Sequence, residues 1–300
     1  MGQIIEAGAR VLRRRWKPLV AAAIVFGGIG LVISETASAH FTEVFSPLLS
    51  TDPVTNAPVF SATDADIERL TWAALASLAG SLIAAASLTV FSVVASVYVE
   101  RAYHGGSTSL RAALSHALRR APVALATWLL TTLVMIGLIV AVVLVAIAST
   151  SIFPGDAQTG GGIGVLLALI AGVAGLVAVV AIGVRWSVAT AVVALEPVGP
   201  IQALRRAWHL TGDNTWRAFG LQLLVVFVVT IVAALISEIL AVIAVLFVSD
   251  GSSLQFGVQV GLSVAVALLT APVLPVMLTA LYFDLRVRRD RPEPAPGPQP

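Results

Sequence analysis

Cysteine is absent from this chain of 300 residues, and charged residues make up only 11% of it. Without cysteine the chain has no disulfide, no thiolate metal site and no cysteine nucleophile. A typical soluble domain is roughly 25% charged, whereas 58% of this sequence is hydrophobic. Because so few charges cannot cover a surface in water, the composition predicts a protein embedded in a membrane.

Basic residues are also few, and their distribution argues against nucleic acid as a partner. The net charge is only +2, and Lys17 is the single lysine. The arginines lie beside apolar runs rather than among exposed aromatic side chains, so the sequence gives no support for binding to nucleic acid. Membrane lipids are the expected partners, and a second membrane protein or another copy of the chain stays open as a further partner.

Long apolar runs are abundant, and six of them are long enough to cross a bilayer, which takes about 20 residues of helix. Lipid offers no hydrogen-bond partner to the backbone, so such runs are expected to be helices. The predicted fold class is all-α, an integral membrane bundle of about six transmembrane helices with cytoplasmic amphipathic interfacial helices. The fourth run is long enough to indicate tilt or a protruding end. The expected spans are residues 18–34, 70–98, 122–149, 162–193, 218–248 and 256–283.

The positions of the arginines predict the orientation of these spans. Basic residues near span ends are retained in the cytoplasm, and seventeen of the eighteen basic residues flank one side, with Arg69 as the exception. We therefore expect the protein to lie in the plasma membrane, with both termini in the cytoplasm. The loops on the opposite side carry the acidic residues Glu35, Glu43, Asp52, Asp64, Asp66, Glu68, Asp156 and Asp250.

These spans divide the chain into a basic N-terminal segment (1–17), a six-helix transmembrane domain (18–290) and a proline-rich tail (291–300). The largest outer loop, 35–69, has the periodicity of neither a strand nor a long helix and is expected to form a solvated cap. The tail cannot continue a helix and is expected to be disordered in the cytoplasm. One alternative stays open, because the Ala-Ser-Ala sequence at 37–39 resembles a signal-peptide cleavage site whose use would leave five spans.

Two of the cytoplasmic connections have the spacing of amphipathic helices. In Ser109 to Arg120 and in Gly199 to Leu210, apolar residues recur at helical intervals while arginines fall on the other side. Both segments are expected to be helices in the membrane interface. The apolar positions of the first are Leu110, Ala113, Leu114, Ala117 and Leu118, and those of the second are Ile201, Leu204 and Trp208.

Matching positions in these two segments are ninety residues apart, as Ala113 and Ala203 are. Similar contexts also surround Tyr98 at the end of the second span and Tyr282 at the end of the sixth, where each is expected at headgroup depth. These internal similarities suggest a repeated helical hairpin with a cytoplasmic surface helix between the copies.

Small residues and prolines predict two features of packing within the spans. Ala76, Gly80 and Ala84 follow one another at intervals of four residues, so one face of the second span is flat enough for another helix to approach closely. Whether that helix is internal or belongs to a second copy stays open. Pro272 and Pro275 are expected to break the sixth helix near its middle.

The stretch from Arg185 to Leu224 reads RWSVATAVVALEPVGPIQALRRAWHLTGDNTWRAFGLQLL. It resembles the membrane domain found beside glycerophosphoryl diester phosphodiesterases and in uncharacterised bacterial multi-pass membrane proteins. The terminal LYFDLRVRR is similar to the closing segment of that family, whereas Ala207 departs from the serine that such proteins often have. The marks that carry the resemblance are Arg185 at a span end, Glu196 before a small turn, Ala203 to Arg206, and the pair Trp216 and Arg217.

This resemblance implies a fold rather than a reaction. A phosphodiesterase of this kind would need a soluble barrel with a His-Arg-Gly start and several metal-binding carboxylates, and no segment here is long or polar enough. The sequence also offers no ordered nucleophile, base and oxyanion arrangement. The protein is therefore expected not to be an enzyme, with no catalytic residue, cofactor or metal site.

One residue stands out within the spans and a group stands out at their ends. Glu238 lies inside the fifth span, where an ionisable side chain is costly enough to be a functional candidate, and it is expected to face other helices. The alternatives are a protonated carboxyl bonded to a neighbouring helix, or a side chain that reaches the outer interface. The candidates for contact with lipid headgroups are Arg119, Arg120, Arg185, Arg205, Arg206, Trp216 and Arg217.

Two functions are consistent with these features. The first is a non-catalytic scaffold or lipid-interacting module of the bacterial cell envelope, favoured by the arginine-bearing amphipathic segments. The alternative is a transporter or permease component for a lipid or small solute, supported by the suspected repeat, by Glu238 and by the broken sixth helix. A third class, a lipid enzyme within the membrane, lacks a cluster of acid, base or metal-ligating residues.

Overall fold

The computed structural model describes residues 2–51, 58–106, 109–152, 161–247 and 253–289. Six helical stretches are long and apolar enough to cross a membrane, which confirms the predicted all-α fold class. The tail 291–300 lies outside the described residues. The elements in order are α1 (Gly2–Phe45), η1 (Ser46–Leu48), β1 (Leu49–Thr51), β2 (Pro58–Phe60), α2 (Asp64–Tyr103), α3 (Leu110–Ile152), α4 (Gly161–Trp186), α5 (Ala189–Leu195), α6 (Pro200–Thr211), η2 (Gly212–Asn214), α7 (Thr215–Phe247), α8 (Ser253–Thr270) and α9 (Val273–Arg289).

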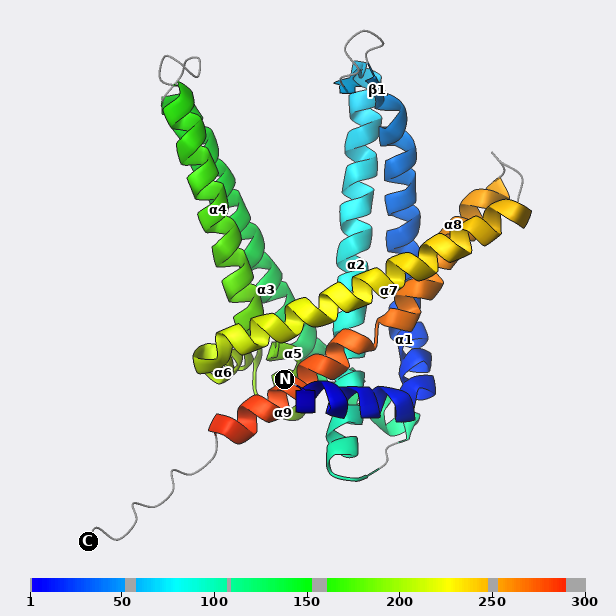
Figure 1. Cartoon of the computed structure of the whole chain (residues 1–300), viewed down its shortest axis with the longest axis vertical. Coiled ribbons are helices and arrows are strands. Elements are labelled where there is room, and N and C mark those ends of the chain that lie inside the picture. The colour runs from blue at the N-terminus through cyan, green and yellow to red at the C-terminus, as the bar shows by residue number, and fades with distance from the viewer. Residues whose placement is uncertain (1, 52–57, 107–108, 153–160, 248–252, 290–300) are drawn as a thin grey trace.

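The spanning helices form three hairpins, α1 with α2, α3 with α4 and α7 with α8, which diverge from one end of the molecule (Figure 1). We call this end the base, and it is where the N-terminal part of α1 packs on α9, which also contacts α5 and α6. Away from the base the hairpins expose apolar side chains such as Leu133, Leu169 and Leu235. Lipid tails solvate such side chains as well as another helix does, so the hairpins can separate there.

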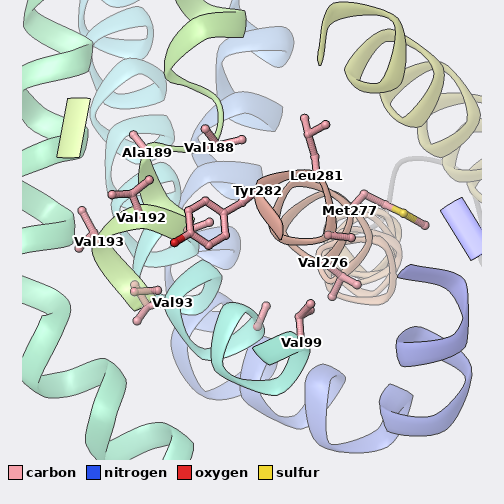
Figure 2. Packing of buried hydrophobic residues seen from close by; sticks show 14 of the residues in the cluster. Val93, Val99, Val188, Ala189, Val192, Val193, Val276, Met277, Leu281 and Tyr282 are labelled. Atoms are coloured by element: carbon pink, nitrogen blue, oxygen red, sulfur yellow. The ribbon is translucent and has the colours of Figure 1, made fainter. Parts of the chain in front are cut away.

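The packed core lies at the base and is centred on the short helix α5. Five of the seven residues of α5 are buried, and Tyr282 points from α9 toward this helix between Val188 and Val192 (Figure 2). Tyr282 and Phe91 are the largest fully buried side chains among the described residues. The base is thus a small globular core from which the spans project.

The fourth span is shorter than its apolar run. The run predicted for 162–193 suggested a tilted or protruding helix, but α4 ends at Trp186 and the chain turns at Val188 before α5 begins. The apolar residues of α5 are used to fill the protein core rather than to contact lipid. A buried helix and a membrane span have the same apolar composition. The prediction from sequence therefore assigned α4 and most of α5 to one span.

The small-residue face of α2 packs against α1 of the same chain. A methyl group placed on Gly80 would lie 3.1 Å from the Cα of Ser34, and one placed on Gly30 would lie 3.1 Å from the Cα of Ala84. Ser38 and Ser77 also lie side by side, with their hydroxyl oxygens 3.3 Å apart. The structure thus answers the open question of the partner, since the close approach is internal.

The basic N-terminal segment is a helix that lies across the base (Figure 1). The backbone leaves helical geometry at Arg15, with φ of −124° and ψ of 21°, so α1 is bent there. Ile4 and Gly8 are buried on this first part of α1, and a Cβ on Gly8 would overlap the sulfur of Met277 in α9. The segment is therefore a third surface helix, which packs on the protein through one face.

The two predicted interfacial helices have different outcomes. Gly199 to Leu210 is confirmed as a separate helix, α6, which begins with Pro200 after Gly199. Ser109 to Arg120 was expected to be a helix in the interface; it is helical, and it forms the first turns of the 43-residue helix α3. At about 1.5 Å per residue, α3 is some 64 Å long and far exceeds a bilayer core of about 30 Å, so one continuous helix can contain both the surface segment and the span.

Two other expectations concern the sixth span and the outer loop. The helix does break at Ala271 and Pro272, which separate α8 from α9, as the prolines predicted. The outer loop is more ordered than expected, because α1 continues to Phe45 and residues 49–51 pair with 58–60 as antiparallel strands. A capping box of Thr63 and Asp66 then starts α2.

Candidate functional site

Three groups of charged side chains connect the elements of the base. In the first, Glu196 follows α5 and its side chain is mostly buried. The Tyr282 hydroxyl donates to Glu196 Oε1 over 2.7 Å, and Arg206 Nε lies 3.6 Å from the same oxygen. Arg286 Nη1 in turn donates to the Tyr282 hydroxyl over 3.4 Å. One carboxylate thus links the end of α5 to α6 and α9.

The second group joins α9 to the start of α7, and the third joins α9 to η2 and the end of α6. Asp284 accepts from Arg288 Nε at 2.9 Å and lies 3.3 Å from Arg217 Nη2. Arg289 pairs with Asp213 at 3.1 Å and donates to the His209 carbonyl. Because Arg217 is mostly buried and its Nε has no partner among the described residues, Asp284 supplies the charge that compensates it.

Helix α6 presents two different faces. Ala203, Ala207 and Leu210 are fully buried against the core. On the opposite side Ile201 is 64% exposed and Trp208 is 38% exposed, with the exposed Arg205 between them at helical spacing. The predicted apolar stripe was therefore only partly right, because of its three members only Leu204 belongs to the buried face.

The outer face of α6 has the composition of a helix at a membrane interface. An apolar side chain, a tryptophan and an arginine share this face, and such faces sit at the boundary between headgroups and acyl chains. Trp216, at the start of α7, is 85% exposed. Tryptophan is enriched at membrane interfaces, so α6 and the first turn of α7 have the composition expected of a segment at a bilayer surface.

A family model described as a domain of unknown function, DUF7847, matches residues 3–285. The chain belongs to the DUF7847 family. No curated protein and no solved structure matches it. The resemblance to the membrane domain of glycerophosphoryl diester phosphodiesterases is thus replaced by membership of DUF7847, and the comparisons show no link to those enzymes.

In this DUF7847 protein the seven predicted headgroup candidates fall into two sets. Arg206 and Arg217 are engaged in the ion pairs described above, and the guanidinium carbon of Arg185 lies 4.3 Å from the ring centre of Trp208, a cation–π geometry. These three hold the base together. The candidates left at the surface are Arg119, Arg205 and Trp216, which are exposed, and Arg120, which is half-buried.

Glu238 does not lie where we expected it. It was predicted to face other helices, but in the DUF7847 chain it is exposed on α7, although α8 of the same hairpin packs against α1. Glu238 precedes Phe247, the last residue of α7, by nine residues, or about 14 Å.

Sequence reasoning missed three features of this DUF7847 site. The N-terminal helix had a readable signal, since Ile4, Gly8, Val11 and Leu12 recur at helical spacing. The hydrogen bond between Glu196 and Tyr282 joins residues 86 apart and had no local signal. Tyr98 was expected at headgroup depth, but it is only 2% exposed, so it belongs to the core of the base, as does Tyr282.

Proposed function

We propose that this member of the DUF7847 family is a non-catalytic multi-pass membrane protein that binds anionic lipid headgroups at its base and serves as a scaffold in the bacterial cell envelope. The outer face of α6 carries this proposal. Ile201, Arg205 and Trp208 are exposed together there, while the opposite face of the same helix is fixed to the core. A rigidly held interfacial helix presents its arginine to lipid at low entropic cost.

The scaffold role is supported by the three divergent hairpins. Each has sides that expose apolar side chains, such as Ile29, Leu133 and Leu235. Spans of other membrane proteins could pack on these sides by van der Waals contact, while the charged base keeps the hairpins together. The alternative function, transport, loses one of its three supports because Glu238 is exposed, and it keeps the similarity between the two halves and the break between α8 and α9.

We further propose that the base faces the cytoplasm, because it carries the arginines that predict retention there. Alkaline phosphatase fused after Phe283 should be inactive, and the same enzyme inserted between Thr51 and Ala65 should be active, since it folds only outside the cytoplasm. Activity assays on cells that express each fusion at equal levels provide the measurement. The reverse pattern would overturn the orientation.

The lipid role is tested at Arg205. Each basic residue near an anionic surface contributes about 1 kcal/mol, so Arg205→Gln should lower the preference for phosphatidylglycerol over phosphatidylcholine about fivefold. Tryptophan quenching by brominated lipids in vesicles measures this preference at Trp208 and Trp216, in a background where the other four tryptophans, Trp16, Trp72, Trp128 and Trp186, are replaced by phenylalanine.

Arg69→Gln is the matched control, because Arg69 is an exposed arginine on α2, at the end of the chain's spans opposite the base. It should leave the lipid preference reported by Trp208 and Trp216 unchanged. An unaltered preference in Arg205→Gln, or an equal fall in both variants, would rule out α6 as the lipid-binding face.

A further inference from the structure

A pocket of about 420 Å³ lies at the base between the N-terminal part of α1, the end of α2 and α9. It is separate from the three charged groups and from the outer face of α6. One wall carries Arg10, Arg14 and Arg15, and the other carries apolar side chains that include Val99, Ala280 and Phe283. The pocket is thus cationic on one side and apolar on the other.

Two of the three arginines lack a compensating carboxylate. Arg10 pairs with Glu6 at 2.8 Å. Arg14 and Arg15 form no ion pair among the described residues, and Arg15 is half-buried. Elsewhere in the base, Arg206, Arg217, Arg288 and Arg289 each meet an acid. The positive charges of Arg14 and Arg15 are therefore available to an anionic ligand.

The fold holds these arginines in place. The bend in α1 is at Arg15, directly beside Arg14, and Gly8 fixes the preceding turns by its close contact with Met277. On the opposite wall Tyr103 stacks on Phe283, with ring centres 4.7 Å apart and planes 4° from parallel. Both walls are therefore built by tertiary contacts rather than by a flexible N-terminal arm.

The ligand chemistry follows from the two walls. Guanidinium groups bind phosphate oxygens through paired, charge-assisted hydrogen bonds. A volume near 420 Å³ is within the usual range of about 300 to 1,000 Å³ for small-molecule sites. The apolar wall would contact the glycerol and first acyl carbons attached to such a phosphate. Gly105, with φ of +71° and no neighbour within 4 Å of a Cβ, keeps the rim free of a side chain.

We propose that this pocket binds a phosphate group, held by Arg14 and Arg15, of an anionic glycerophospholipid or of a soluble glycerol phosphate ester. The inference rests on the proposed lipid-binding function and names a second, specific site for it. It differs from the α6 face in kind, because the pocket would retain one ligand per chain whereas an interfacial face exchanges lipids freely.

Native mass spectrometry of the full chain in detergent tests the lipid source, with phosphatidylglycerol and phosphatidylcholine added in equal amounts. The wild type should keep one phosphatidylglycerol per chain, and the Arg14→Gln, Arg15→Gln double variant should lose it. The matched control combines Arg13→Gln with Lys17→Gln, two exposed residues outside the pocket lining, and should keep the lipid. Ala102→Phe, which fills the pocket and leaves every arginine in place, should lose it as well.

The soluble source is tested on the delipidated protein by its melting temperature with glycerol 3-phosphate or inorganic phosphate. A rise in the wild type and the control, absent from the double variant and without any retained lipid, would assign the pocket to a soluble ester. Retention of the lipid by the double variant and by Ala102→Phe, or no response to any of these ligands in the wild type, would overturn the proposal. The proposed function fails separately, if Arg205→Gln leaves the lipid preference in vesicles unchanged.

Discussion

Replacing Tyr282 by alanine should lower the free energy of unfolding by about 3 to 5 kcal/mol, as expected for a large aromatic side chain removed from a packed core. Tyr282 is fully buried and points from α9 toward α5, where Val188 and Val192 surround its ring (Figure 2). The variant would lose this packing and would also remove the hydroxyl that donates to Glu196. A large fall in the melting temperature in detergent should follow, because the core of the base is the main region in which the hairpins are joined.

Tyr282→Phe separates the two contributions. It keeps the ring and removes only the hydroxyl that donates to Glu196, while Arg206 stays near the same carboxylate. The loss should be about 1 kcal/mol, the usual net value of one hydrogen bond. Equal melting temperatures for the alanine and phenylalanine variants would show that packing around the ring is not what stabilises the base.

Gly30→Leu should destabilise the α1–α2 hairpin by about 1 to 3 kcal/mol, the usual cost of overpacking. A Cβ on Gly30 would lie 2.7 Å from Ser87 Oγ and 3.1 Å from the Cα of Ala84. The serine side chain can rotate away, but the backbone of α2 cannot move without separating the two helices. Thermal unfolding in detergent measures the loss, and cysteine pairs introduced across α1 and α2 should form a disulfide more slowly.

Gly28→Leu is the matched control, two residues away on the same helix. A Cβ there meets nothing within 4 Å, so leucine would point into lipid. Since glycine costs about 1 kcal/mol relative to good helix formers within a helix, this variant should be as stable as the wild type or slightly more stable. A similar loss in both variants would mean that the close approach of α1 and α2 contributes little.

Local features of the sequence predicted much of the architecture. The long apolar runs predicted the positions of the spans, because a helix needs a minimum length to cross the bilayer. Pro272 broke the last span as expected, and Gly199 with Pro200 marked the start of α6. The helix predicted at Ser109 to Arg120 is present but runs on into the third span, because amphipathic spacing reports which face of a helix is polar and not whether the helix continues.

The candidate site was less predictable because it depends on contacts between distant residues. Arg185, Arg206 and Arg217 resemble Arg205 in sequence context, yet they are engaged by Trp208, Glu196 and Asp284. Arginine at a span end is equally suited to a headgroup and to an acidic partner. The outcome is set by which elements meet at the base, and the spacing of residues along one helix carries no information on that.

The sequence alone determined that the chain is all-α, that six helices are apolar enough to cross a membrane, and that the arginines gather at one end of them. These properties follow from composition and from the hydrogen-bonding demands of the backbone in lipid. Only the tertiary structure decided that α5 is buried, that the hairpins diverge, that Glu238 is exposed, and that Arg14 and Arg15 face a pocket. Apolar residues satisfy lipid and protein core equally well, so the choice between them rests on how helices far apart in the sequence pack together.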